Sequence, residues 1–123
     1  MKNLLSFFDV NRPCDITWIH RANQLKKLEQ YHKSRQIMMI EGDISQRNGI
    51  AVMTHDSEQE TDLTFDAWIK KIARSNRGVK LDFKESSVVL PCLEKLLQLN
   101  PKIPILLNAD ILQGPGGKVP KFE

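Results

Sequence analysis

The run Ile37-Met-Met-Ile-Glu-Gly-Asp-Ile44 decides the fold, because it has the apolar character of a buried strand but carries two carboxylates near its end. Strands of a parallel sheet are covered on both faces, so charged side chains within them are scarce. Side chains two residues apart in a strand share a face, so Glu41 and Asp43 are expected to point the same way. The run therefore predicts a buried strand that presents an acid pair on one side of a sheet.

Apolar runs and helical patterns alternate along the rest of the chain. Further strands are expected at 16–20, 50–55, 79–83 and 103–108, and helices over 22–33, from a cap at Asp62 or Thr64 to before Gly78, and from a cap at Ser86 or Ser87 through Leu99. Repeated β-then-α order favours a parallel sheet, which could be an open doubly wound sheet or a barrel. The expected fold class is α/β.

The length of the chain limits how much of a barrel it can form. Its 123 residues suit one domain, whereas a complete eight-stranded TIM-type barrel needs about 200 residues or more. We therefore expect a partial (β/α) TIM-type barrel with about five strands, truncated before closure as a splice form or a fragment would be. Its core would span residues 16–112, and a Gly/Pro-rich tail would occupy 113–123.

Composition and charge fit a soluble globular protein. Hydrophobic residues make up 41% of the chain and charged residues 27%, which is ordinary for such proteins. Eighteen basic and fifteen acidic residues give a formal net charge of +3, and the basic residues are spread along the chain instead of forming a run. Nucleic acid is therefore not expected as a partner.

The sequence favours the cytoplasm. The apolar stretch from Leu4 to Phe8 is too short for a secretory signal, and no run approaches the roughly 20 apolar residues of a membrane span. Cys14 and Cys92 lie far apart without metal-type spacing, so reduced thiols are favoured over a disulfide. We expect a cytoplasmic chain in which both cysteines are unpaired.

Polar side chains recur late in every expected strand. They are His20, Glu41, Asp43, His55, Lys80, Asp82, Lys84, Asn108 and Asp110. In (β/α) barrels the carboxyl ends of the strands form the active-site face. The pattern therefore predicts a functional site at that end of the sheet, with Asn108 and Asp110 facing it from the last strand.

Three of the acids are candidate metal ligands. Glu41 and Asp43 share a strand face, and Asp82 would come from a neighbouring strand. Clustered carboxylates repel one another without a cation, and Mg²⁺ or Ca²⁺ prefers oxygen ligands of this kind. The alternative is that each acid is a strand-end carboxylate paired with a lysine.

Two histidines end successive apolar runs and are candidates for an acid and base pair. Breaking a phosphodiester requires one group to take a proton from the nucleophile and another to protonate the leaving oxygen near neutral pH. His20 and His55 could fill these roles, although a lone histidine at a strand end is more often structural. We expect His20 and His55 to face the same space as the acids.

The turn after the second strand decides where His55 points, and Asn48-Gly49 is a tight-turn signal. A two-residue loop would pair residue 42 with His55 and turn the imidazole to the wrong face. A three-residue loop over 47–49 with a glycine bulge would pair Glu41 with His55. The expected site requires the second register.

Three cations are candidate phosphate-binding residues. A diester anion needs cationic donors besides the metal, and Arg21, Lys80 and Lys84 are suitably placed in the sequence. Arg21 could equally be a surface charge at the start of a helix. The expected ligand is a small phosphodiester or a lipid head group.

Six blocks in order resemble the menorin family over residues 16–116. The blocks are Ile16-Thr-Trp-Ile-His-Arg-Ala-Asn23, Met39-Ile-Glu-Gly-Asp-Ile44, Met53-Thr-His-Asp56, Asp62-Leu-Thr-Phe-Asp-Ala-Trp68, Gly78-Val-Lys-Leu-Asp-Phe-Lys84 and Leu107-Asn-Ala-Asp-Ile-Leu112. The resemblance implies the N-terminal half of a barrel related to PLC-like and glycerophosphodiester phosphodiesterases. In those enzymes a His-Arg strand end precedes Glu-x-Asp and then His-Asp.

By that likeness, His20 and His55 would be the acid and base pair, and Glu41 and Asp43 would bind the metal. Asp82 would be the third ligand, where the enzymes often have the longer Glu. The implied activity is hydrolysis of glycerophospho- or lipid-type phosphodiesters, with this short form inactive if the second half is required. The alternative is a non-enzymatic binding or signalling protein with a role in neuronal development or maintenance.

Overall fold

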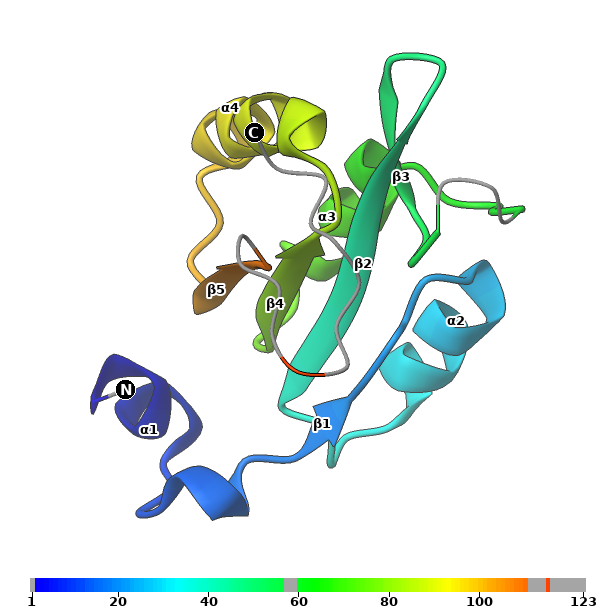
Figure 1. The fold of residues 1–123 in the computed structure, drawn as a ribbon. Helices are drawn as coiled ribbons and strands as arrows, with labels where there is room; N and C mark the ends of the chain where they lie inside the picture. The colour runs from blue at the N-terminus through cyan, green and yellow to red at the C-terminus, as the bar shows by residue number, and fades with distance from the viewer. Residues whose placement is uncertain (1, 57–59, 111–114, 116–123) are drawn as a thin grey trace.

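Five strands form one sheet in the computed structural model, which describes residues 2–56, 60–110 and 115 (Figure 1). The strands are β1 (Trp18–Ile19), β2 (Met39–Arg47), β3 (Ile50–Met53), β4 (Gly78–Phe83) and β5 (Ile105–Ala109). The helices are α1 (Lys2–Phe8), α2 (Leu25–Lys33), α3 (Phe65–Ile72) and α4 (Val89–Leu99), with short 3-10 turns η1 (Pro13–Asp15) and η2 (Ser86–Val88). The fold is mixed α/β, as expected.

The sheet order is β1-β2-β4-β5, and these four strands are parallel. Glu41 of β2 pairs with Lys80 of β4, and Asp43 pairs with Asp82. Strand β3 runs antiparallel to the second half of β2. In β2, the carbonyl of residue 41 accepts a hydrogen bond from the Ala22 backbone nitrogen, and that of residue 43 accepts one from the Thr54 backbone nitrogen. The carbonyl of residue 44 points to the other edge and accepts from the Lys84 backbone nitrogen. Strand β3 therefore lies on the same edge of β2 as β1, with β4 on the other edge.

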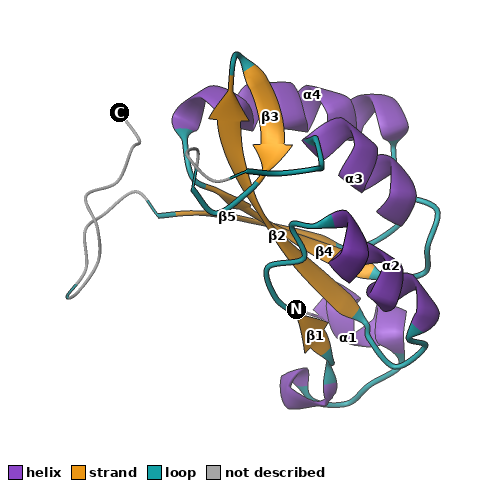
Figure 2. Ribbon diagram, turned by 90° about the vertical axis from the view of Figure 1, so that its right-hand side faces the viewer, coloured by secondary structure: helices purple, strands orange, loops and turns teal. Residues whose placement is uncertain are grey.

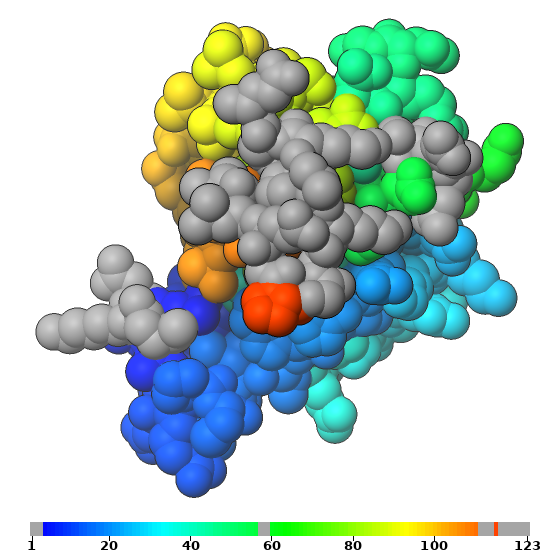
Figure 3. Space-filling view, in the orientation of Figure 1, coloured from blue at the N-terminus to red at the C-terminus, as the bar shows by residue number. Residues whose placement is uncertain are grey.

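The turn between β2 and β3 has two residues, so the register that the sequence argument required for His55 is wrong. Ile44 pairs with Met53, and Arg47 pairs with Ile50. Asn48 and Gly49 have φ values of 52° and 78°, which is the geometry of a type I′ turn whose twist suits a two-residue hairpin. The tip of this hairpin projects at the upper right of the space-filling view (Figure 3).

The two faces of the sheet carry different side chains. Ile40, Ile44 and Leu81 are fully buried in one apolar cluster with Trp68 and with other residues of α2, α3 and α4. Those three helices lie together on one side of the sheet (Figure 2). Because side chains alternate along a strand, residues 41, 43, 80 and 82 belong to the opposite face. The acid pair is therefore on the face away from α2, α3 and α4.

A smaller apolar cluster covers the face of the sheet that bears the acid pair, at the start of β2. Met39 of β2 packs with Leu4 of α1 and with Ile16. Neither α1 nor η1 was expected from the sequence. A seven-residue helix is too short to be stable alone, so packing of Leu4 against Met39 accounts for it.

The ends of the helices were predicted in part. Thr64 caps α3, and its Oγ1 accepts a hydrogen bond from the Ala67 backbone nitrogen at 3.1 Å. The predicted serine cap of the last helix is wrong, because Ser86 begins η2 and the residue before α4 is Val88, which makes no side-chain cap. Pro91 lies in the first turn of α4, where the missing amide hydrogen is tolerated.

Cys14 and Cys92 are unpaired, as expected. Across residues 2–56, 60–110 and 115, no helix has both the length and the apolar character to cross a bilayer. The predicted tail over 113–123 lies outside the described residues, apart from residue 115.

Candidate functional site

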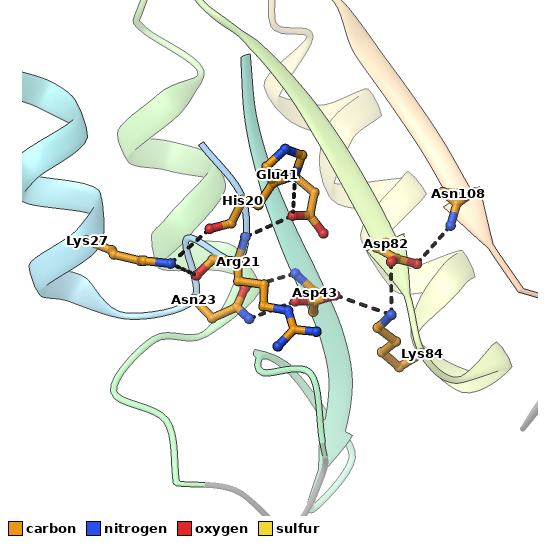
Figure 4. A network of polar contacts seen from close by, with 9 residues as sticks. All are labelled: His20, Arg21, Asn23, Lys27, Glu41, Asp43, Asp82, Lys84 and Asn108. Carbon is orange, nitrogen blue, oxygen red and sulfur yellow. Dashed lines mark hydrogen bonds and ion pairs between the residues drawn. The ribbon is translucent and has the colours of Figure 1, made fainter. Parts of the chain in front are cut away.

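Glu41, Asp43 and Asp82 come together on the face opposite the packed helices (Figure 4). One carboxylate oxygen from each lies within 4.8 Å of the others. Glu41 is 6% exposed, Asp43 1% and Asp82 9%, which is unusual for side chains that carry charge. The register that pairs Asp43 with Asp82 produces this proximity directly.

The loop between β1 and α2 holds the two acids of β2. The backbone nitrogen of Arg21 donates to Glu41 Oε2 at 2.8 Å. The Asn23 side chain bonds Asp43 twice, because its Nδ2 donates to Asp43 Oδ2 at 2.9 Å and its Oδ1 accepts from the Asp43 backbone nitrogen at 2.9 Å. Arg21 has φ 51°, a left-handed conformation that is uncommon outside glycine. Asn23 was not predicted as a site residue, although it lies only two residues after Arg21.

Two residues from helices fix this loop in turn. Lys27 of α2 donates from Nζ to the carbonyl oxygens of His20 and Arg21 at 2.9 and 3.2 Å. Trp68 of α3 donates from Nε1 to the Ala22 carbonyl at 2.8 Å. The indole reaches that carbonyl beside Gly42, where a Cβ would lie 2.9 Å from Trp68 Cζ2. Trp68 was not among the predicted site residues.

On the other side of the cluster, Lys84 and Asn108 bind Asp82. Lys84 Nζ lies 2.9 Å from Asp82 Oδ2 and 3.3 Å from Asp43 Oδ1. Asn108 Nδ2 donates to Asp82 Oδ1 at 3.0 Å. Burial acts to lower the pKa of Lys84, but the hydrogen bond to Asp82 and the charges of Asp43 and Asp82 outweigh it and raise the pKa. Lys84 is therefore a charged ammonium that offsets part of the negative charge of the cluster.

The two predicted catalytic histidines differ in position. His20 Nδ1 lies 3.4 Å from Glu41 Oε2, and the imidazole stacks on Trp18 with ring centroids 5.9 Å apart. Its side chain is 71% exposed, so a ligand could reach it. In the hairpin register Thr54 stands across from Asp43, and its backbone nitrogen donates to the Asp43 carbonyl at 3.0 Å. His55 is exposed and does not belong to the group of close ligand atoms.

Among the described residues, the side chains of the other predicted site residues make no hydrogen bond or ion pair with the three carboxylates. Lys80 is half-buried and stands opposite Glu41 in the backbone register of β2 and β4. The Arg21 side chain is exposed, and its backbone makes the contact with Glu41. Asp110 is exposed just beyond β5. The structure thus brings Glu41, Asp43, Asp82, Lys84, Asn108 and His20 into one polar network.

The sequence blocks that build this network match a family. The Menorin N-terminal domain matches residues 13–122. The chain belongs to the menorin family. It is similar to Protein FAM151B of Homo sapiens, with 34% identity over 129 aligned residues that cover 94% of this chain and 46% of that protein. This menorin-family chain spans about half the length of that curated relative. No solved structure matches this chain.

The donor set of this menorin-family chain fits a hard divalent cation. Carboxylate oxygens are the ligands that Mg²⁺ and Ca²⁺ prefer, and Glu41, Asp43 and Asp82 could each supply one. Asn23 and Asn108 donate to these carboxylates and so fix their orientation, as outer partners of metal ligands commonly do. Lys84 is already bound to two of the same oxygen-bearing groups and would compete with a cation for them.

Proposed function

We propose that the chain carries the first part of a metal-dependent, phosphodiesterase-like site on a partial (β/α) barrel. The observation that supports this best is the convergence of Glu41, Asp43 and Asp82 on the face away from α2, α3 and α4. In a barrel that face is the interior, and the carboxyl ends of the strands bear the active site. Asp43 lies near the end of the part of β2 that pairs with β4, Asp82 lies near the end of β4, and Lys84 directly follows β4.

The fold is compatible with a barrel segment. Four of the five strands are parallel, and α2, α3 and α4 lie on the same side of the sheet, as they would on the outside of a barrel. The small cluster of Leu4, Ile16 and Met39 would then close the amino-terminal end of the interior. A second half supplied by a longer protein would complete the barrel.

In this proposal Glu41, Asp43 and Asp82 hold Mg²⁺ or Ca²⁺. When bound, such an ion supplies positive charge that stabilises negative charge on phosphoryl oxygens. Lys84, with Arg21 and Lys80, binds and orients the anionic diester, because cationic donors fit its oxygens. The substrate is a small phosphodiester of the glycerophospho or lipid type.

His20 is the residue that moves a proton in this scheme. Its Nδ1 lies 3.4 Å from Glu41 Oε2, and a carboxylate on that side favours a proton on Nδ1, which leaves Nε2 to exchange a proton with the substrate. His55 stays a prediction as the second member of the pair. The register of the hairpin gives it no support.

The metal part of the proposal is tested by thermal unfolding in millimolar Mg²⁺ or Ca²⁺. A ligand that binds only the folded chain stabilises it, by about 2.7 kcal/mol at a hundredfold excess over Kd. Glu41→Gln and Asp43→Asn should lose the shift, whereas Glu29→Gln, an exposed acid of α2, should keep it. A wild-type chain that neither cation stabilises would contradict the metal site.

Turnover is tested by hydrolysis of a glycerophosphodiester. The assay is run on this chain and on a longer menorin-family relative, each with its His20→Ala equivalent. Loss of His20 should lower the rate about 10²- to 10⁴-fold wherever there is activity, because it removes general acid or base catalysis. Equal rates for the wild type and the variant would exclude His20 from the chemistry.

Lys84 favours a second candidate, a binding or signalling protein that keeps the site without turnover. Its ammonium bridges Asp43 and Asp82 and offsets part of their negative charge without a metal. Asp82, which is shorter than the Glu that the related enzymes often have, agrees with a site that has lost turnover. For this candidate, neither cation stabilises the chain, and Lys84→Met lowers stability because it leaves two buried carboxylates without their partner.

A further inference from the structure

An open groove lies at the amino-terminal end of the strands, away from the acid cluster. It is lined by the ends of three helices and the loops that follow them. The lining residues are His32 at the end of α2, residues 70, 71 and 73–76 at the end of α3 and after it, and residues 99–103 at the end of α4 and after it. The loops after α3 and α4 lead into the first residues of β4 and β5. The acid cluster lies at the other ends of the same strands, so the groove is a separate feature.

The groove is strongly cationic. His32, Lys70, Lys71, Arg74 and Lys102 line it, and among the described residues no aspartate or glutamate does. Lys70 is neutralised by Asp66, with Nζ 2.9 Å from Oδ2. Lys71, Arg74 and Lys102 have no acidic partner within the described part of the chain. Unpaired like charges that share a concave surface repel one another and attract anions.

Helix dipoles explain only part of this charge. Lys70 and Lys71 lie in the last turn of α3, and His32 lies in the last turn of α2, where cations stabilise the carboxyl end of a helix. Arg74 lies beyond α3, and Lys102 lies three residues beyond α4 in the loop before β5. These two side chains are outside the turns where the dipole acts.

His32 lies close enough to Lys71, which also lines the groove, to feel its positive charge. Burial lowers its pKa first, and the charges of Arg77 and Lys71 lower it further. Apolar surface is also present, from Ala73, Leu99 and Ile103. A ligand that fits must therefore carry negative groups together with apolar ones.

We propose that this groove binds an acidic segment of a partner protein, in which carboxylate side chains alternate with apolar ones. Complementary charge guides such segments and fixes their position. Single-stranded nucleic acid is disfavoured because, among the residues that the structure describes, no phenylalanine, tyrosine or tryptophan lines the groove to stack on bases. Insertion into a membrane surface is disfavoured because it uses protruding amphipathic helices, whereas this surface is recessed.

The experiment uses a fluorescein-labelled peptide in which glutamates alternate with leucines, titrated with the full chain and followed by fluorescence anisotropy. Saturable binding that weakens as salt rises is expected, because exposed charges are screened. Lys71→Glu, Arg74→Glu and Lys102→Glu should each raise Kd about fivefold, the size of one exposed charge pair. All three residues are exposed, so the variants should fold, which circular dichroism checks.

Lys26→Glu is the matched control, because Lys26 is an exposed lysine of α2 outside the groove. It should leave Kd unchanged, and a peptide with glutamine in place of glutamate should not bind. The proposal is overturned if the glutamine peptide binds equally well or if charge reversal in the groove has no effect beyond that of Lys26→Glu. Tighter binding of anionic vesicles or single-stranded DNA through the same three residues would also overturn it.

Discussion

Gly42 separates the two acids of β2 and lies against the helices on the other face of the strand. A Cβ at this position would lie 2.5 Å from Met53 Cε and 2.9 Å from Trp68 Cζ2. The methionine end could move, but the indole is fully buried and bonded to the Ala22 carbonyl. The acid pair and the close packing of Trp68 therefore depend on the same glycine.

Gly42→Ala should lower the free energy of unfolding by about 1–3 kcal/mol, as overpacking of a filled core does. Urea denaturation followed by circular dichroism measures the change. Glu29→Ala, at an exposed position of α2, serves as the control and should cost less than about 0.5 kcal/mol. If Gly42→Ala left the free energy of unfolding unchanged, the Trp68 side chain would be able to shift without cost.

The buried thiol of Cys92 should make the free energy of unfolding depend on pH in the alkaline range. Burial raises the pKa of its thiol from 9.0 to about 12. A group with a raised folded-state pKa stabilises the fold below its unfolded pKa, and this contribution is lost as pH rises toward the folded value. Between about pH 8 and pH 11, the free energy of unfolding should therefore fall by about 3 kcal/mol more in the wild type than in Cys92→Ala.

Denaturation at the two pH values measures this difference. Burial also raises the pKa of Tyr31 to about 12, so its contribution is common to both proteins and cancels in the comparison. Cys14→Ala is the control, because Cys14 is exposed and its removal should leave the pH dependence unchanged. Equal slopes for wild type and Cys92→Ala would show that the thiol does not ionise later in the folded chain.

At the scale of elements, the sequence predicted the strands and helices whose apolar residues recur at a regular spacing. The core strands and the helices α2, α3 and α4 were predicted from apolar spacing, and the shared strand face of Glu41 and Asp43 followed from alternation. Helix α1 was missed because its stability depends on Leu4 packing against distant residues. The hairpin register that the site required for His55 was wrong, because the turn has two residues instead of three, and a register differing by one residue reverses the face of every side chain.

The contact between α3 and the loop before α2 could not be predicted either, because Trp68 and Ala22 lie 46 residues apart. Apolar spacing identifies an indole as core but does not reveal what its nitrogen bonds. In the structure that bond fixes the carbonyl between Arg21 and Asn23, which hold Glu41 and Asp43. Helix α3 thus positions the acid cluster from the opposite face of the sheet.

Trp68→Phe should keep most of the packing but lose this hydrogen bond, leaving the Ala22 carbonyl without its partner. The expected cost is about 1–3 kcal/mol of unfolding free energy. Amide hydrogen exchange at Arg21 and Asn23 should accelerate more than exchange in β4, because the loop loses an anchor that β4 does not use. Uniform acceleration across the chain would indicate lost stability alone, without a positioning role.

At the scale of the whole molecule, apolar surface is exposed on one side. Leu107 of β5 is 52% exposed, and Leu90 and Leu97 of α4 are 64% and 80% exposed. Within the described residues, β5 is paired only with β4, so its outer edge has no strand beside it. An unpaired strand edge next to exposed leucines promotes association between chains. In a longer relative, a further strand and helix would be the natural cover for this surface.

The 123-residue chain alone should therefore associate as its concentration rises, which sedimentation velocity would detect. Leu107→Lys should weaken the association, because a charge on an edge strand disfavours pairing with another edge. Ile50→Lys is the matched control: Ile50 is 56% exposed but lies on the β2–β3 hairpin, so the variant should associate like the wild type. A monodisperse wild-type monomer with a cooperative thermal transition would contradict this prediction and would mean that five strands form a complete fold.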